Sequence, residues 1–119
     1  MNIQAFAKAT NITAYTIRYY EKIGLVKNIE RNNSGHRCFT DKDIVWFEFI
    51  KRLKDTNMSL ANIKKYADLR DIGDTTSDLR MAMLEKHAQV LAKKIAEEQG
   101  HLNKLNDKIN YYSEMLKRK

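Results

Sequence analysis

The last third of the sequence contains a strict apolar repeat, which constrains the fold more than any other feature. From residue 81 to residue 116, apolar side chains recur at alternating spacings of three and four residues. Glu98 is the only charged residue at these positions. We call this set the heptad seam: Met81, Leu84, Ala88, Leu91, Ile95, Glu98, Leu102, Leu105, Ile109, Tyr112 and Leu116. The spacing predicts a helix with a coiled-coil stripe. A helix of ~40 residues, ~60 Å long, cannot bury that stripe alone, so we expect a second copy of the chain to cover it.

Gly100 lies inside the repeat and leaves two interpretations open. A glycine in a helix interior costs about 1 kcal/mol relative to alanine, so the segment could be two shorter helices that fold back as a hairpin. The heptad phase nevertheless continues unchanged through Gly100, and no cluster of turn residues accompanies it. We therefore favour one continuous helix. Its expected dimerisation residues are Leu84, Leu91, Ile95, Leu102, Leu105, Ile109, Tyr112 and Leu116.

Positive charge is concentrated in the first part of the chain. The net charge is +7, and residues 1–70 hold 13 Lys and Arg against 7 Asp and Glu, whereas residues 71–119 hold 9 against 8. This asymmetry predicts an anionic partner, either nucleic acid or a membrane surface, for the first part. The start of the chain lacks a signal-peptide pattern, and no segment approaches the ~20 apolar residues of a membrane span. We expect a cytoplasmic protein without a membrane partner.

Residues 1–25 have the pattern of two short helices joined by a tight turn. Apolar spacing predicts one helix over residues 3–9, capped by Asn2, and a second over residues 14–23, capped by Thr13. This is the helix-turn-helix pattern, in which the second helix enters the major groove of DNA. The second helix carries basic and phenolic groups at four-residue spacing, which suit a phosphate-lined groove better than an apolar core. They are Arg18 and Lys22, and Tyr15 and Tyr19.

Residues 26–39 change character and predict a small β-hairpin. A turn cluster at residues 32–35 separates two short segments that contain apolar side chains. The tip carries Arg31, His36 and Arg37, so it could contact a phosphate backbone. An irregular connector is the alternative interpretation.

Two further helices complete the first domain. Thr40 and Asp43 predict a capping box at the start of a third helix with a wide apolar face. Lys54 lies near the end of that helix, where it could contact a nucleic-acid backbone, and Ser59 caps a fourth helix. We predict a domain over residues 1–70, a connector over residues 71–78 and a dimerisation helix over residues 79–119.

Three motifs together resemble the MerR family of bacterial transcription regulators. They are T-I-R-Y-Y-E-K-I-G-L at residues 16–25, G-H-R-C-F-T at residues 35–40 and F-I-K-R-L at residues 49–53. The resemblance covers the whole chain, and residues 58–112 are most similar to the aldehyde-responsive branch related to AdhR and NmlR. It implies a mainly α fold: a winged helix-turn-helix domain followed by a long C-terminal helix that forms an antiparallel coiled-coil dimer.

The resemblance also implies a mechanism and a set of DNA-binding residues. The homodimer would bind promoter DNA with an over-long spacer and distort it, realigning the promoter elements for RNA polymerase in response to a stress signal that the sequence does not identify. Arg18 and Tyr19 would contact phosphates or bases, Arg37 would reach the backbone, and Tyr20 would pack in the core. The expected DNA-binding set is Thr13, Tyr15, Thr16, Arg18, Tyr19, Lys22, His36, Arg37 and Lys54.

The signal-sensing residues of related proteins are missing here. Metal-sensing members carry cysteines after the dimerisation helix, but residues 110–119 contain none, and the aldehyde-responsive branch typically has a cysteine where this chain has Arg52. Cys38 is the single thiol, which excludes an internal disulfide. It is either a redox switch, because His36 and Arg37 could favour its thiolate, or a small packed side chain.

Nothing in the sequence supports catalysis or a bound cofactor. Paired carboxylates, a nucleophile motif and a glycine-rich phosphate loop are all absent, so an enzyme is the weakest of the three functions considered. His87 and His101 flank the seam without other soft ligands, and we expect no metal site. The main alternative to a regulator is a coiled-coil adaptor with a non-specific nucleic-acid-binding basic domain.

Overall fold

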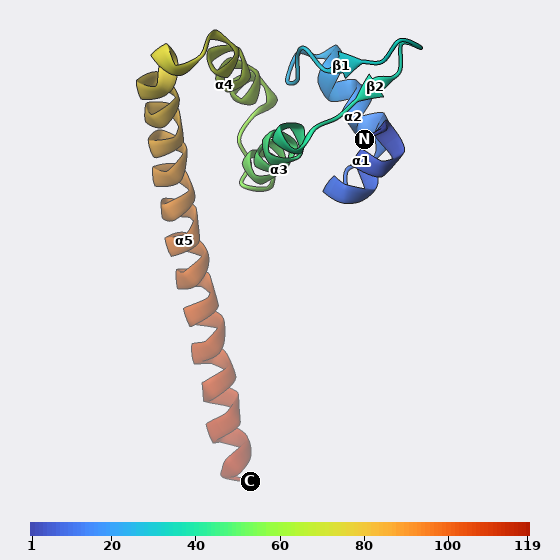
Figure 1. The fold of residues 1–119 in the computed structure, drawn as a ribbon. Coiled ribbons are helices and arrows are strands. Elements are labelled where there is room, and N and C mark those ends of the chain that lie inside the picture. The colour runs from blue at the N-terminus through green and yellow to red at the C-terminus, as the bar shows by residue number, and fades with distance from the viewer. The chain divides into compact units, whose positions relative to one another are not determined.

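The computed structural model describes all 119 residues and is mainly helical (Figure 1). The elements in chain order are α1 (Ile3–Thr10), α2 (Ala14–Lys22), β1 (Glu30–Arg31), β2 (Arg37–Cys38), α3 (Asp41–Asp55), α4 (Leu60–Ile72), a 3-10 helix η1 (Asp74–Thr76) and α5 (Ser77–Lys117). Contacts divide them into two compact units, residues 1–82 and residues 83–119. The winged helix-turn-helix elements all lie in the first unit.

Side-chain caps begin the first two helices where the sequence predicts them. The Asn2 side chain accepts a hydrogen bond from the Ala5 amide at 2.8 Å, and Thr13 Oγ1 accepts one from the Thr16 amide at 3.1 Å. Each bond satisfies an amide that has no partner inside its helix. Asn11, in the left-handed conformation with φ 56°, ends α1 one residue later than predicted. Both predicted helices are confirmed.

The predicted hairpin is present as a short antiparallel ribbon. Glu30 pairs with Cys38 and Arg31 with Arg37, and we call residues 30–38 the wing. Its tip is closed by Asn32, whose side-chain oxygen accepts hydrogen bonds from the amides of residues 34 and 36, each at 3.0 Å. The alternative of an irregular connector is therefore wrong.

An aromatic cluster ties the wing to the helices beside it. The ring of Phe39, directly after β2, stacks on Phe6 of α1 with centroids 4.1 Å apart, and Phe47 of α3 packs edge-on against Phe6 at 4.9 Å. All three rings are buried, and Ile17 of α2 joins them in the core. The predicted capping box of Thr40 and Asp43 begins α3 immediately after this cluster.

Helix α4 begins after the predicted Ser59 cap and packs through Ile63, Tyr66 and Ala67, which are buried. The Tyr66 ring stacks on Trp46 with centroids 5.9 Å apart, whereas Leu60 at the start of the helix is exposed. The Arg70 guanidinium lies 4.3 Å from the centroid of the Trp46 ring on the same cluster. The Trp46 indole in turn donates a hydrogen bond to the Leu25 carbonyl at 3.1 Å.

The chain between α4 and α5 is shorter than the connector predicted over residues 71–78. Helix α4 continues to Ile72 and α5 begins at Ser77, with η1 between them. Helix α5 then runs without interruption through Gly100 for 41 residues, which confirms the single-helix interpretation. None of its residues is buried, and the heptad seam is exposed except at Leu84 and Leu91, which are half-buried. No helix of the structure has both the length and the hydropathy needed to cross a membrane.

Candidate DNA interface

One face of α2 is exposed and carries polar and basic side chains. Its members fall at spacings of three and four, and all are exposed: Tyr15, Arg18, Tyr19 and Lys22. Neither Arg18 nor Lys22 makes an ion pair, so both charges are available to a ligand. Tyr20 faces the other way and is buried as predicted; burial, followed by the nearby Asp55 and Tyr19, raises the pKa of its hydroxyl.

Glu21 connects α2 to the wing. Its carboxylate oxygen Oε1 accepts a hydrogen bond from Arg37 Nε at 2.7 Å and lies 3.5 Å from Arg31 Nη2. The Glu21 and Arg37 side chains are each only 23% exposed, so this pair is well shielded from water. Arg31 also donates a hydrogen bond to the Gly35 carbonyl at 3.0 Å. Glu21 therefore holds both wing arginines, and Arg31 is held by the wing as well.

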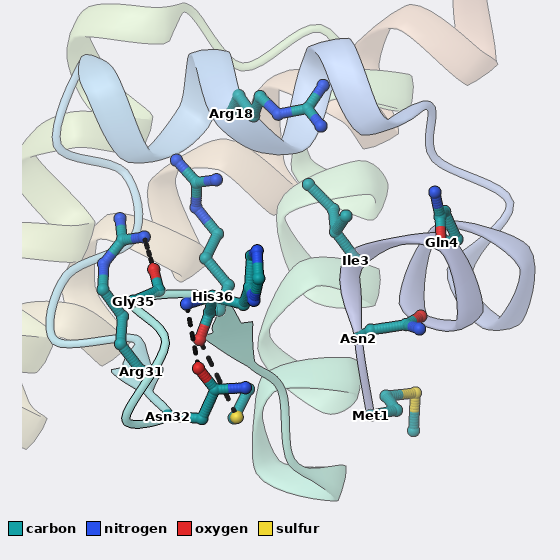
Figure 2. Close-up of a pocket in the computed structure, with 11 residues that line it drawn as sticks. Met1, Asn2, Ile3, Gln4, Arg18, Arg31, Asn32, Gly35 and His36 are labelled. Atoms are coloured by element: carbon teal, nitrogen blue, oxygen red, sulfur yellow. Dashed lines mark hydrogen bonds between the residues drawn. The ribbon is translucent and has the colours of Figure 1, made fainter.

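A groove of about 730 Å³ lies between α1, α2 and the wing (Figure 2). Figure 2 shows Arg18 projecting from α2 on one side and His36 on the wing facing it, with Asn2 and Gln4 beside them. The groove also receives Arg31 and Arg37, so its cationic groups come from two separate elements. A groove with cationic groups on both sides can bind an extended anion, such as the phosphate backbone of a nucleic acid.

Arg37 retains the groups needed to bind a phosphate. Only its Nε atom is used within the chain, and a guanidinium has five N–H donors in a planar fork. The two terminal nitrogens can therefore donate to a second acceptor while Glu21 fixes the orientation of the plane. A guanidinium arranged in this way is suited to bidentate recognition of a phosphate.

The structure brings together only part of the expected DNA-binding set. Arg18, His36 and Arg37 line the groove, whereas the other six residues lie outside its lining. Thr13 and Thr16 are hydrogen-bonded to each other at the start of α2, with 2.9 Å between their hydroxyl oxygens. Lys54 is on α3, with its Nζ atom 5.8 Å from the centroid of the Tyr20 ring. The DNA contacts of the whole set remain predictions.

Eight residues outside the expected set also line the groove, among them the polar or charged side chains of Gln4, Arg31 and Asn32. The positive charge of Arg31 at the wing tip was evident from the sequence. Strand β1 is too short for an alternating pattern to indicate on which face of the wing the Arg31 side chain lies. No pattern in the sequence marked Gln4 or Asn32 as a site residue, because their place in the groove lining depends on tertiary packing. The role of Glu21 was also not evident, since ion pairing across sixteen residues depends on the hairpin.

Cys38 lies on β2 and is partly exposed, and its thiol points to the His36 carbonyl at 3.9 Å. It also lines the groove. The redox interpretation of this thiol stays a prediction.

Comparison with known families agrees with this geometry. Residues 1–69 match the family described as MerR HTH family regulatory protein, and residues 44–108 match the family described as MerR, DNA binding. The first match alone covers more than half of the chain. The chain belongs to the MerR family. The resemblance predicted from the sequence motifs is therefore confirmed, as is the mainly α fold with a winged helix-turn-helix and a long C-terminal helix.

Several MerR relatives are similar to this chain over most of its length. An uncharacterised HTH-type transcriptional regulator of Haemophilus influenzae is 40% identical over 106 residues, which cover 89% of this chain and 78% of the relative. The HTH-type transcriptional regulator AdhR of Bacillus subtilis is 38% identical over 91 residues, covering 76% of this chain and 65% of AdhR.

Among solved structures, HiNmlR is described as a MerR family regulator lacking the sensor domain, bound to promoter DNA. It matches with a TM-score of 0.84 and 37% identity, covering 95% of this chain and 90% of HiNmlR. A putative MerR family regulator from Listeria monocytogenes matches with a TM-score of 0.90 and 34% identity, covering 95% of this chain and 86% of that one. The predicted similarity to the AdhR and NmlR branch of the MerR family agrees with these matches.

Proposed function

We propose that this MerR protein is a transcription regulator that binds double-stranded promoter DNA sequence-specifically. The observation that carries the proposal is the groove in which Arg18 of α2 meets the wing arginines fixed by Glu21. A helix with unpaired basic groups beside a cationic hairpin fits a major groove and the adjacent phosphates. HiNmlR, a relative of the same fold, is bound to promoter DNA in its crystal structure, which supports the proposal.

The two sides of the groove have different roles in this proposal. Arg18 and Tyr19 project from α2 toward base edges and phosphates, whereas Arg37 donates to the backbone from the wing. Most protein–DNA hydrogen bonds go to phosphate and sugar, so the majority of these residues position the protein and few specify the sequence. Arginine is the side chain best suited to reading guanine, which makes Arg18 the main candidate for direct readout.

The regulator acts as a homodimer in this proposal, because α5 exposes an apolar seam that a single chain leaves uncovered. Two copies place two wings and two recognition helices on one operator. The dimer binds between the promoter elements, bends and untwists an over-long spacer, and presents those elements to RNA polymerase in the cytoplasm. We assign no effector, since the cysteines of the metal- and aldehyde-sensing relatives have no counterpart here.

Binding is tested with a labelled duplex from the region upstream of the gene or of its neighbour. Fluorescence anisotropy with the wild type should show tight binding that weakens steeply with salt, because neutralised phosphates release counterions. Arg18→Ala should weaken operator binding by about 1–3 kcal/mol, roughly 5- to 150-fold. It should also reduce the ratio between the affinity for the operator and the affinity for a scrambled duplex. Arg118→Ala removes the same charge directly after the C-terminal end of α5 and is the matched control.

Three outcomes decide the DNA-binding proposal. Full-strength, sequence-specific footprinting by the Arg18→Ala variant would contradict the role of α2. Equal affinity of the wild type for operator and scrambled duplexes would instead support a non-specific adaptor. Loss of affinity in both variants alike would show that net charge, and not the groove, determines binding.

Promoter distortion is tested separately by transcription in vitro. With purified RNA polymerase, the protein should stimulate a promoter with an over-long spacer and have little effect on the same promoter shortened to the usual spacing. Equal stimulation of both templates would contradict the distortion mechanism while leaving DNA binding intact.

A further inference from the structure

A second cavity lies within residues 1–82, where α3, α4 and the first turn of α5 meet. Its volume is about 240 Å³, and none of its lining residues lines the DNA groove. Three aromatic and three cationic side chains make up most of the lining. We call this cavity the junction pocket. We propose that it binds a small aromatic carboxylate, and that this ligand is the signal to which the regulator responds.

Three aromatic rings form the apolar part of the junction pocket. Trp46 and Phe49 come from α3 and Tyr66 from α4, and their ring centroids lie between 5.7 and 6.3 Å apart. Trp46 and Tyr66 are buried, and Phe49 is half-buried. The indole N–H of Trp46 already donates to the Leu25 carbonyl, so this ring offers a ligand only its apolar surface. Clustered rings at these distances favour a further flat ring, packed offset or edge-on.

The cations of the junction pocket come from three different helices. They are Lys42 on α3, Arg70 on α4 and Arg80 on α5. None of the three makes an ion pair, and no Asp or Glu lines the pocket. Lys42 and Arg70 are exposed, whereas two of the three rings are buried. Uncompensated positive charge beside an apolar wall favours a ligand that is both flat and anionic.

Arg80 is already held in position at this junction. Its Nε atom donates a hydrogen bond to Thr76 Oγ1 at 3.1 Å. Its Nη2 atom donates to Ser77 Oγ at 3.1 Å and to the Gly73 carbonyl at 3.3 Å. The Nη1 amino group is not used in these bonds, and a guanidinium in a fixed plane loses little freedom when it binds a carboxylate. Arg80 can therefore donate from Nη1 to an anion in the pocket.

The size and the mixed lining of the pocket define the ligand class. A volume of about 240 Å³ is below the range of about 300–1,000 Å³ that is typical of pockets for drug-sized ligands, so a molecule with a single ring fits. Inorganic phosphate would use the cations and leave the rings uncovered. A neutral ring would cover the aromatic wall and leave the cations unpaired. A single-ring aromatic carboxylate, of which benzoate is the simplest, uses both parts of the lining.

Such a ligand would connect three helices through one anionic group. Because Lys42, Arg70 and Arg80 lie on different helices, a bound carboxylate joins α3 and α4 to the start of α5. In the proposed function α5 joins the two copies of the regulator. A ligand that binds one arrangement of this junction more tightly increases the population of that arrangement. The role of the ligand as a signal therefore rests on the proposed function, whereas its binding does not.

Intrinsic fluorescence measures occupation of the pocket directly, because Trp46 is the only tryptophan of the chain. Titration of the full chain with benzoate should give a saturable change in emission. Benzamide has nearly the same shape without the charge and should bind about tenfold more weakly, because hydrogen bonds to charged groups are the stronger ones. Cyclohexanecarboxylate keeps the charge but lacks the flat ring, and should bind about threefold more weakly. A response to benzoate that does not saturate, or an analogue that binds as tightly as benzoate, would overturn the assignment.

Substitutions at exposed lining positions test where benzoate binds. Lys42→Ala should weaken benzoate binding about fivefold and leave benzamide binding unchanged. Val45→Phe adds volume to the lining and should weaken binding of both compounds about tenfold. Lys65→Ala is the matched control, because Lys65 is exposed on α4, makes no ion pair and does not line the pocket. A thermal melt checks that each variant is folded.

Two results of this series would overturn the site. Equal loss of benzoate affinity in Lys42→Ala and Lys65→Ala would show that net charge determines binding. Unchanged affinity in both Lys42→Ala and Val45→Phe would place benzoate elsewhere on the chain. Weaker binding in both lining variants, with wild-type binding in the control, would support the junction pocket.

Transcription in vitro tests the ligand as a signal. On the promoter with an over-long spacer, saturating benzoate should change the transcript level obtained with the wild type about fivefold or more. Lys42→Ala should need about fivefold more benzoate for half of that change. Benzoate that saturates the Trp46 signal without changing transcription would overturn the signalling role. A wild type that fails to bind operator DNA with or without benzoate would instead contradict the proposed function, and the fluorescence titration would still decide the site.

Discussion

Glu21→Gln tests whether the ion pair between α2 and the wing organises the DNA interface. The substitution keeps the shape of the side chain but removes the charge that holds Arg37 at 2.7 Å and Arg31 at 3.5 Å. Two effects on DNA affinity oppose each other. Loss of a negative charge favours binding to phosphate, whereas loss of the anchor frees two long side chains that must be ordered again on the DNA.

The magnitudes favour weaker binding. A carboxylate about 10 Å from a phosphate repels it by about 0.4 kcal/mol in water, and screening at physiological salt reduces this to about 0.1 kcal/mol. Immobilising a flexible side chain costs about 0.5–1.5 kcal/mol. Arg37 should contribute most of that cost because its pair with Glu21 is more shielded than that of Arg31. We expect operator affinity to fall roughly tenfold.

Anisotropy titrations at several salt concentrations measure this effect, with Glu48→Gln as the matched control. Glu48 lies on α3, is exposed and makes no ion pair, so its substitution changes net charge alone. The control should bind as the wild type does or slightly more tightly. If Glu21→Gln behaves like the control, the wing arginines need no anchor and the positioning role of Glu21 is refuted. A thermal melt of both variants checks that the fold is retained.

Three further substitutions test the dimer and the support of α2. Leu102→Lys places charge in the seam and should shift the protein from dimer to monomer in sedimentation; an unchanged dimer would count against the heptad interpretation. Gly24→Ala should lower the melting temperature by several degrees, since φ at Gly24 is +82° and the left-handed conformation costs a residue with a Cβ about 1–2 kcal/mol; the end of the flexible Lys64 side chain, 2.8 Å from the added Cβ, can shift away. Hydrogen bonds from Lys64 and Lys27 lower the pKa of Asp68 from its ordinary 3.8. The ionised carboxylate therefore stabilises the fold fully at pH values above 3.8, and this stabilisation is lost as the pH falls through the lowered pKa. The Asp68→Asn variant should therefore have a lower melting temperature than the wild type at pH 7 and the same melting temperature in strong acid. A difference in melting temperature that persists in strong acid would contradict this assignment.

Local signals in the sequence predicted most of the fold. Asn2, Thr13, Thr40 and Ser59 each cap the helix expected of them, because a cap depends on chemistry within three residues. The heptad repeat likewise predicted α5 through Gly100, since the helical period is itself a local property. Helix existence and position therefore followed from short-range rules.

Long-range contacts were less accessible from the sequence. The burial of Tyr66 depends on a ring stack with Trp46, twenty residues earlier in the chain. The attachment of Arg37 to Glu21 depends on how the hairpin folds back against α2. The sequence named Arg18, His36 and Arg37 as site residues, but only the fold shows that they share one groove with Gln4 and Asn32.

The wing has a root and a tip that should tolerate change very differently. Its root continues into Phe39, whose ring is stacked within the core, whereas the turn at the tip is closed only by hydrogen bonds within the wing itself, among them those to the Asn32 side chain. Insertions or replacements between residues 32 and 36 therefore leave the core rings in place, whereas a change at the root disturbs the stack of Phe39 on Phe6. Among proteins with this architecture, the tip is consequently where loop length and composition can diversify, and where a grafted sequence could retarget the protein to a different operator.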